Sequence, residues 1–214
     1  MRLLPPTRAG KIRLAVMLAV LLGLALFFRP DRFAAAMLYD KHEGDILFQS
    51  LPRGDLTDAI EGISDSQWSH CGVLVRDGDQ WMVVEAIGEV RMTLLKLWLF
   101  RSRHCRFAAY RVDAMKAADM PKLRKAIDAM MGKPYDYHYA PDDDEIYCSE
   151  LVFRAYERGL EMKIGDWQKL GDLNWRPFEK FVRSMEQGSL PLEREMITPV
   201  ALTRSPLVHR VSWW

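Results

Sequence analysis

The chain has 214 residues, 49% of them hydrophobic, and a formal net charge of +1. Five basic and no acidic side chains fall within residues 1–30, so the remainder carries a net charge of −4, which argues against a nucleic-acid-binding protein. The sequence has no glycine-rich phosphate loop and no internal repeat. Its length and composition suit one domain with a sizeable core.

The first predicted element is an apolar segment at the N-terminus. Four basic residues precede an uncharged run from Leu14 to Phe28, a pattern typical of an export signal or a membrane anchor. As a helix, this run would cover about 22 Å of a bilayer core of roughly 30 Å, so a span would need local thinning or snorkelling side chains. Ala34–Ala36 could serve as a cleavage site, but the charged residues before it favour an uncleaved anchor. We predict a membrane anchor or signal segment over residues 1–36 and an exported, cell-envelope location, with the anchor orientation left open.

A strand over Asp45–Gln49 and a long loop lead to a predicted β-hairpin over Ser69–Ile87. Asp77-Gly78 lies between two runs rich in β-branched and aromatic residues, which is a strong hairpin signal. Counting outward from that turn puts His70 directly opposite Glu85, with Cβ atoms roughly 4.5–5.5 Å apart. A carboxylate at this distance would hold the imidazole in one tautomer and stabilise its protonated form.

The middle of the chain predicts the rest of a small sheet and its helices. The apolar segment Thr93–Phe100 fits a short helix over the sheet, an acyl-chain groove or a membrane contact, and a covering helix is the commonest of these. A strand near Arg106–Val112 and a helix near Pro121–Met131 follow. The predicted fold is α+β, with a small antiparallel sheet packed with helices over residues 40–214, preceded by the N-terminal apolar helix.

The last strong signal is a helix over Cys148–Arg158. Cys148 lies in its first turn, where the helix dipole and unpaired N–H groups favour a thiolate and could hold an oxyanion. A core role is commoner for a single cysteine on the apolar face of a helix. The predicted pair of His70 and Glu85 reverses that preference and makes Cys148 the candidate nucleophile.

The other cysteines bear on this hypothesis. Cys71 follows His70 and should point to the opposite, buried face of the sheet, because strand side chains alternate. A structural disulfide through Cys148 would abolish the thiolate, so its absence is a requirement. Zinc ligands usually lie two to four residues apart, unlike the adjacent pairs His70-Cys71 and His104-Cys105. We predict neither a metal nor another cofactor.

Five stretches of this sequence form a recognisable set: GDILF (44–48), SHCGVLV (69–75), VVEA (83–86), GKPYDYHY (132–139) and YCSELV (147–152). Together they resemble the permuted papain-like amidases, the YiiX/YaeF branch of the NlpC-like thiol hydrolases. The resemblance covers about residues 40–160, and the histidine precedes the acidic residue and the cysteine, the reverse of ordinary papain-like chains.

The resemblance implies a circularly permuted papain-like fold with Cys148 as nucleophile, His70 as base and Glu85 as the residue that orients it. Tyr135 and Tyr147 match motif positions near the site and are candidate substrate-binding or oxyanion residues.

The expected reaction is covalent acyl transfer by a cysteine hydrolase or acyltransferase. Export suggests an amide of a cell-wall-type peptide as substrate, which is the preferred hypothesis. The anchor and the apolar segment Leu94–Phe100 suggest instead a lipid acyl ester or amide. A protein of another class, a catalytically silent binding module at the membrane, would be favoured by a shallow pocket and a buried Cys148. The sequence predicts no oligomeric state.

Overall fold

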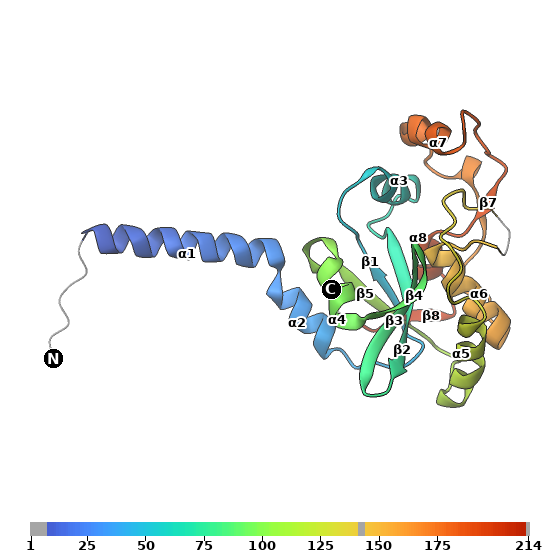
Figure 1. Ribbon diagram of the computed structural model, residues 1–214, viewed down its shortest axis with the longest axis horizontal. Coiled ribbons are helices and arrows are strands. Elements are labelled where there is room, and N and C mark those ends of the chain that lie inside the picture. Colours follow the sequence, from blue (N-terminus) through green and yellow to red (C-terminus); the bar gives the residue numbers. More distant parts are fainter. Residues whose placement is uncertain (1–7, 141–143, 213–214) are drawn as a thin grey trace.

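The computed structural model describes residues 8–140 and 144–212, so residues 1–7 of the predicted N-terminal segment lie outside the described residues (Figure 1). The helices are α1 (Arg8–Phe28), α2 (Pro30–Leu38), α3 (Asp55–Ile63), α4 (Leu95–Arg101), α5 (Met120–Asp128), α6 (Cys148–Leu160), α7 (Glu179–Met185) and α8 (Pro199–Thr203). Short 3₁₀ helices are η1 (Arg103–Cys105), η2 (Ala117–Asp119), η3 (Leu170–Asp172) and η4 (Arg176–Phe178). The strands are β1 (Ile46–Gln49), β2 (His70–Asp77), β3 (Gln80–Ile87), β4 (Glu89–Leu94), β5 (Phe107–Val112), β6 (Gln168–Lys169), β7 (Glu195–Met196) and β8 (Val208–Arg210).

A six-stranded antiparallel sheet forms the centre of the domain, in the order β4-β3-β2-β1-β5-β8. This confirms the predicted α+β class and the predicted strands near β1 and β5. The predicted helix near Pro121–Met131 corresponds to α5. The loop predicted before the hairpin was wrong in part, because it contains α3, and the strands β4 and β8 were not predicted.

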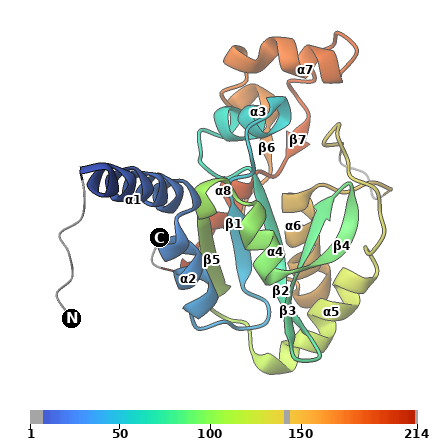
Figure 2. The ribbon, with the colours of Figure 1, turned by 60° about the vertical axis from the view of Figure 1, so that its left-hand side comes forward.

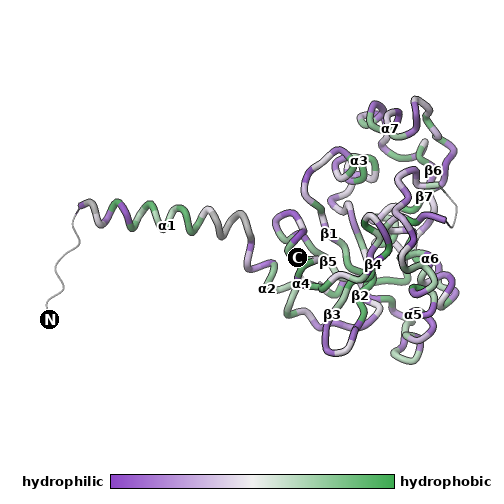
Figure 3. Tube along the Cα trace, viewed as in Figure 1, coloured by the Kyte–Doolittle hydropathy of each residue, from purple (hydrophilic) through white to green (hydrophobic). Residues whose placement is uncertain are grey.

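Helices cover both faces of this sheet (Figure 2). On one face, Val73, Val84 and the rest of a large buried cluster pack against Leu151 and Val152 of α6 and against α5. A second cluster on the other face joins strands β1, β2, β3 and β5 to α2 and α4. The tube of Figure 3 shows hydrophobic residues concentrated along the central strands. Burial of these faces from water supplies the main driving force for folding.

The ambiguous apolar segment Thr93–Phe100 ends strand β4 and then forms the covering helix α4. Trp98 and Leu99 are completely buried against the sheet, whereas Leu97 and Phe100 are exposed. The covering-helix interpretation is therefore confirmed for the buried face of α4.

The predicted N-terminal segment divides into two structurally different parts. Helix α1 projects away from the domain in Figure 1, whereas helix α2 packs against the domain. Ala36 of α2 is 1% exposed, and Phe33 and Met37 contact the same cluster. Within the described residues, none of the helices combines the length and the apolar character needed to cross a membrane.

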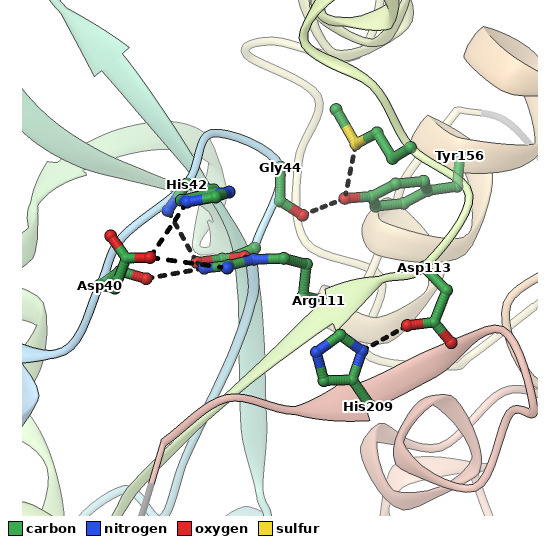
Figure 4. Close-up of polar contacts among 9 residues, drawn as sticks. Asp40, His42, Gly44, Arg111, Asp113, Tyr156 and His209 are labelled. Atoms are coloured by element: carbon green, nitrogen blue, oxygen red, sulfur yellow. Dashed lines mark hydrogen bonds and ion pairs between the residues drawn. The ribbon is translucent and has the colours of Figure 1, made fainter.

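Helix α6 is also tied to the sheet at the end of β1 remote from Gln49. The Tyr156 hydroxyl donates a hydrogen bond to the carbonyl oxygen of Gly44 (Figure 4). Nearby, the Arg111 guanidinium binds the Asp45 carboxylate, with a distance of 2.8 Å from Nε to Oδ1. This attachment fixes how α6 lies across the strands and so fixes where its first residue, Cys148, is placed.

Candidate active site

The structure brings His70 and Glu85 together, but not in the predicted register. Nε2 of His70 lies 2.6 Å from Oε2 of Glu85, and both side chains are buried. The turn consists of Gly78 and Asp79, so the strand pairing is shifted by two residues from the predicted one. Directly opposite pairing of His70 and Glu85 was therefore wrong. A shift of two keeps each side chain on its face of the sheet, so the two residues still meet diagonally.

Gly72 makes this diagonal contact possible. A Cβ atom at Gly72 would lie 2.6 Å from the carbonyl oxygen of Val84 and 3.4 Å from Cβ of Glu85. Real Cβ atoms do not approach a carbonyl oxygen so closely, so only glycine fits between these strands. The space left open allows the side chain of Glu85 to reach His70.

Glu85 is held as a carboxylate by three donors. Besides His70, the Thr93 hydroxyl donates to Oε1 at 2.6 Å, and Nη2 of Arg101 lies 2.5 Å from Oε2. Burial opposes ionisation, but the hydrogen bond from His70 and the charges of His70 and Arg101 outweigh it and lower the Glu85 pKa to about 2. Glu85 therefore stays charged across the physiological pH range.

Cys148 is the first residue of α6, and it lies beside both Cys71 and His70. A hydrogen bond from the Cys71 side chain lowers the Cys148 pKa most, burial opposes this, and the hydrogen bond and charge of His70 lower it further, well below its ordinary value. Burial raises the pKa of Cys71. These directions favour the thiolate form of Cys148 and the neutral thiol form of Cys71.

The histidine is correspondingly a cation in the resting site. Burial lowers the His70 pKa, but hydrogen bonds to Cys148 and Glu85 and their charges raise it to about 9. Because Nε2 faces Glu85, the other ring nitrogen is left for exchange of a proton with Cys148. Both shifts favour a thiolate at Cys148 beside an imidazolium at His70, which is the form that a cysteine nucleophile requires.

Cys71 is on the buried face that α6 covers, in the same cluster as Val73 and Cys148. None of the three cysteines forms a disulfide, which meets the requirement set for Cys148. In the described part of the chain, no group of three or more His, Cys, Asp or Glu side chains is placed to hold a metal ion.

The two candidate tyrosines have different surroundings. Tyr147 is completely buried, and its hydroxyl accepts a hydrogen bond from the Ile197 backbone N–H at 3.0 Å. It therefore braces the segment around Ile197 against the start of α6. The hydroxyl of Tyr135 lies 3.3 Å from that of Tyr139, and the charge of Cys148 raises the pKa of both after burial, the larger cause.

An apolar pocket opens beside Cys148. The empty space between its walls and in its open mouth is about 720 Å³, much of it continuous with the solvent. Most of its lining is aliphatic or aromatic and comes from distant parts of the chain, including Leu56, Ile60, Tyr139, Val182 and Met196. Polar groups are confined to a few positions, among them Glu186 and Arg194, which pair with each other.

Sequence reasoning missed Thr93, Arg101, Tyr139 and most of this pocket. Tyr139 lies inside a stretch already singled out, so its tyrosine-rich pattern was an available signal. Thr93 and Arg101 gave no local signal, because their contacts with Glu85 depend on how β4 and α4 pack.

A cysteine at a helix start, preceded in the chain by a histidine from an antiparallel sheet, is the arrangement expected of a papain-like thiol hydrolase of permuted order. The family model of the permuted papain-like amidases, YaeF/YiiX, C92 family, matches residues 40–212, and the chain belongs to that family. It is a cysteine amidase or peptidase-like hydrolase.

Two relatives agree with this assignment. The chain is 31% identical over 195 residues to YiiX of Escherichia coli strain K12, which is described as uncharacterized, with 90% of this chain and 94% of YiiX covered. A crystal structure of YiiX from Escherichia coli O157:H7, described as a metalloprotein, matches with a TM-score of 0.78 and 30% identity. That match covers 82% of this chain and 99% of the solved chain.

Proposed function

We propose that the protein hydrolyses an amide or ester by covalent catalysis through Cys148, His70 and Glu85. The Cys148 thiolate attacks the carbonyl carbon, and His70 gives its proton to the amine or alcohol that leaves. The backbone N–H of Cys148 at the start of α6 supplies part of the oxyanion hole. The observation that carries the proposal is the buried contact of 2.6 Å between His70 and Glu85, together with the interaction with His70 that lowers the pKa of Cys148.

The pocket indicates the acyl part of the substrate. Its mainly apolar lining next to the thiolate favours a lipid-like acyl group over the polar peptides of a cell wall. We therefore propose an acyl lipid ester or amide, and the cell-wall peptide becomes the alternative that the experiment must separate.

The burial of Cys148 has to be reconciled with catalysis. The residue is 2% exposed, which a silent binding module would also show, but it forms part of the pocket wall. In this proposal the substrate reaches the sulfur only through that pocket. If the test finds no turnover that depends on Cys148, the alternative of a catalytically silent binding module is favoured.

The test is a parallel screen of the purified full-length protein in detergent against N-acyl amines, acyl lipid esters and peptidoglycan fragments. We expect release of fatty acid by the wild type and none by Cys148→Ala. Turnover of peptidoglycan fragments alone would replace the lipid proposal with the peptide one. Turnover that is equal in Cys148→Ala would contradict covalent catalysis.

We also propose that the N-terminal segment attaches the chain to a membrane on the cell-envelope side. The basic residues before Leu14 and the exposed apolar side chains of α1, such as Leu18 and Leu22, support attachment.

A further inference from the structure

The carboxylate of Glu85 is shared between His70 and a second cation. Oε2 of Glu85 lies 2.6 Å from Nε2 of His70 and 2.5 Å from Nη2 of Arg101. Glu85 has no exposed surface, whereas the Arg101 side chain is 26% exposed. A positive charge thus enters the buried site from the surface, through the last residue of α4.

The position of Arg101 is built into the fold. Trp98, one turn earlier in α4, is completely buried against the sheet. In the orientation that satisfies both ends of its amide, Gln49 of β1 accepts hydrogen bonds from Trp98 Nε1 at 3.2 Å and Arg101 Nη2 at 3.3 Å, and donates to the Trp98 carbonyl at 2.9 Å. Arg101 is therefore aimed at Glu85 by a buried contact between β1 and α4.

The charges of the resting site balance in pairs. The Cys148 thiolate faces the His70 imidazolium, and the Glu85 carboxylate faces Arg101. Three buried titratable side chains around this group are neutral: Cys71 of β2, and Tyr135 and Tyr139 from the segment before α6. A further cation, Arg91 of β4, lies directly opposite Glu85 in the sheet, but it is exposed to solvent. Without Arg101, the buried group would carry one uncompensated negative charge, which burial makes costly.

Acylation of Cys148 changes this balance, because the sulfur then carries no charge. The imidazole is left beside Glu85, whose negative charge favours binding of a proton, and close to Arg101, whose positive charge opposes it. Hydrolysis of the acyl-enzyme needs a neutral His70 to accept a proton from water.

We propose that Arg101 is a positioning residue that holds Glu85 and offsets its charge, so that His70 can act as a neutral base when water attacks the acyl-enzyme. The inference rests on the proposed function. In this step the water oxygen bonds to the acyl carbon, a water proton passes to His70, the carbon–sulfur bond breaks, and the sulfur leaves as the Cys148 thiolate. The carboxylic acid is released.

Burst kinetics with p-nitrophenyl hexanoate separate the two half-reactions, because the leaving group departs as the p-nitrophenolate anion and needs no proton from His70. We expect Arg101→Gln in the full-length protein to keep the burst amplitude and to change the burst rate by less than about threefold. Steady-state turnover at pH 7 should fall by about tenfold. The midpoint of its increase with pH should lie about one pH unit higher than in the wild type. Arg101→Lys should restore most of the turnover. Lys96→Gln, which removes an exposed charge from the same helix, should match the wild type.

A second measurement needs no substrate. In Cys148→Ser the side chain is uncharged, as in the acyl-enzyme, and the His70 titration can be followed by NMR with His70→Ala for assignment. Adding Arg101→Gln to Cys148→Ser should raise the titration midpoint of His70 by about one pH unit.

An unchanged or lower titration midpoint of His70 would overturn the inference. So would an equal loss of burst and steady-state rates in Arg101→Gln. Absence of a Cys148-dependent burst in the wild type would count against the proposed function, whereas the NMR result still decides the role of Arg101.

Discussion

At the scale of residues, two neighbouring thiols of the site have pKa values shifted in opposite directions. Cys71 and Cys148 pack in one cluster, yet the pKa of Cys148 is lowered and that of Cys71 is raised. The difference arises because the Cys71 side chain donates a hydrogen bond to Cys148 and His70 lowers the Cys148 pKa further, whereas burial and the neighbouring Cys148 raise the pKa of Cys71.

The first prediction concerns the reactivity of Cys148. Because its pKa is lowered, the thiolate should persist as the pH falls from 8 to 6, and alkylation by iodoacetamide should stay fast over that range. Peptide mapping of the folded protein should show Cys148 labelled well before Cys71 or Cys105. In 8 M urea the three rates should converge. Slower labelling of Cys148 than of Cys105 in the folded protein would contradict an activated thiolate.

The second prediction concerns the three proposed catalytic residues as a unit. Because general-base assistance contributes about 10²–10⁴-fold, His70→Ala should lower kcat by at least that order. Glu85→Gln keeps a hydrogen-bonding side chain and should lose less. The double variant should be barely worse than His70→Ala, since both changes remove the same function. Steady-state rates test this, and losses that multiply in the double variant would show that Glu85 does not act through His70.

At the scale of elements, the hairpin shows what local patterns determine. The Asp-Gly signal located the turn, and alternation put His70 and Glu85 on one face even though the register was two residues off. Helix α3 carries Leu56, Ala59, Ile60 and Ile63 at helical spacing, so its signal was present in the sequence and was overlooked. Strand β4 has no such pattern, and its pairing with β3 depends on contacts that a local window of sequence does not contain.

The third prediction follows from the close approach of β2 and β3. Gly72→Ala should push the strands apart, because its Cβ would lie 2.6 Å from both the Val84 carbonyl oxygen and Cγ1 of Val83. We expect a loss of about 1–3 kcal/mol in the free energy of unfolding and slower alkylation of Cys148. Gly54→Ala is the matched control, since its Cβ would meet no atom within 4 Å and its φ of 175° is extended. Equal stability of the two variants in urea unfolding would show that the strands tolerate the added methyl group.

At the scale of the whole molecule, the pocket joins segments that are far apart in the chain. Leu56 of α3, Val182 of α7 and Met196 of β7 face the same cavity as Cys148. Sequence motifs identified Cys148, His70 and Glu85 because these residues lie in short stretches that resemble the family. The residues that line the pocket could not be found in this way, because they meet only through tertiary packing. The preference for an apolar acyl group therefore came only from the structure.

The fourth prediction concerns the N-terminal segment. The full-length chain should sediment with membranes at physiological salt, and a high-salt wash should weaken but not abolish this, because salt screens the basic residues but not the apolar run that follows them. A variant that starts at Pro30 should be found in the soluble fraction with its fold intact. A start at Met37 should be less stable, because it removes Ala36 and Phe33 from the second core cluster. Wild-type protein in the soluble fraction with a new N-terminus near Ala36 would identify a cleaved signal.

The central claim is that Cys148 forms an acyl-enzyme, and trapping that species tests it most directly. The full-length protein is mixed with p-nitrophenyl hexanoate, quenched in acid within the burst, and its intact mass and peptide map are measured. We predict one hexanoyl group per chain on the peptide that contains Cys148, much less in His70→Ala, and none at that peptide in Cys148→Ala. A wild-type chain that releases hexanoate with no acyl group on Cys148, or that is acylated equally in Cys148→Ala, would contradict the account.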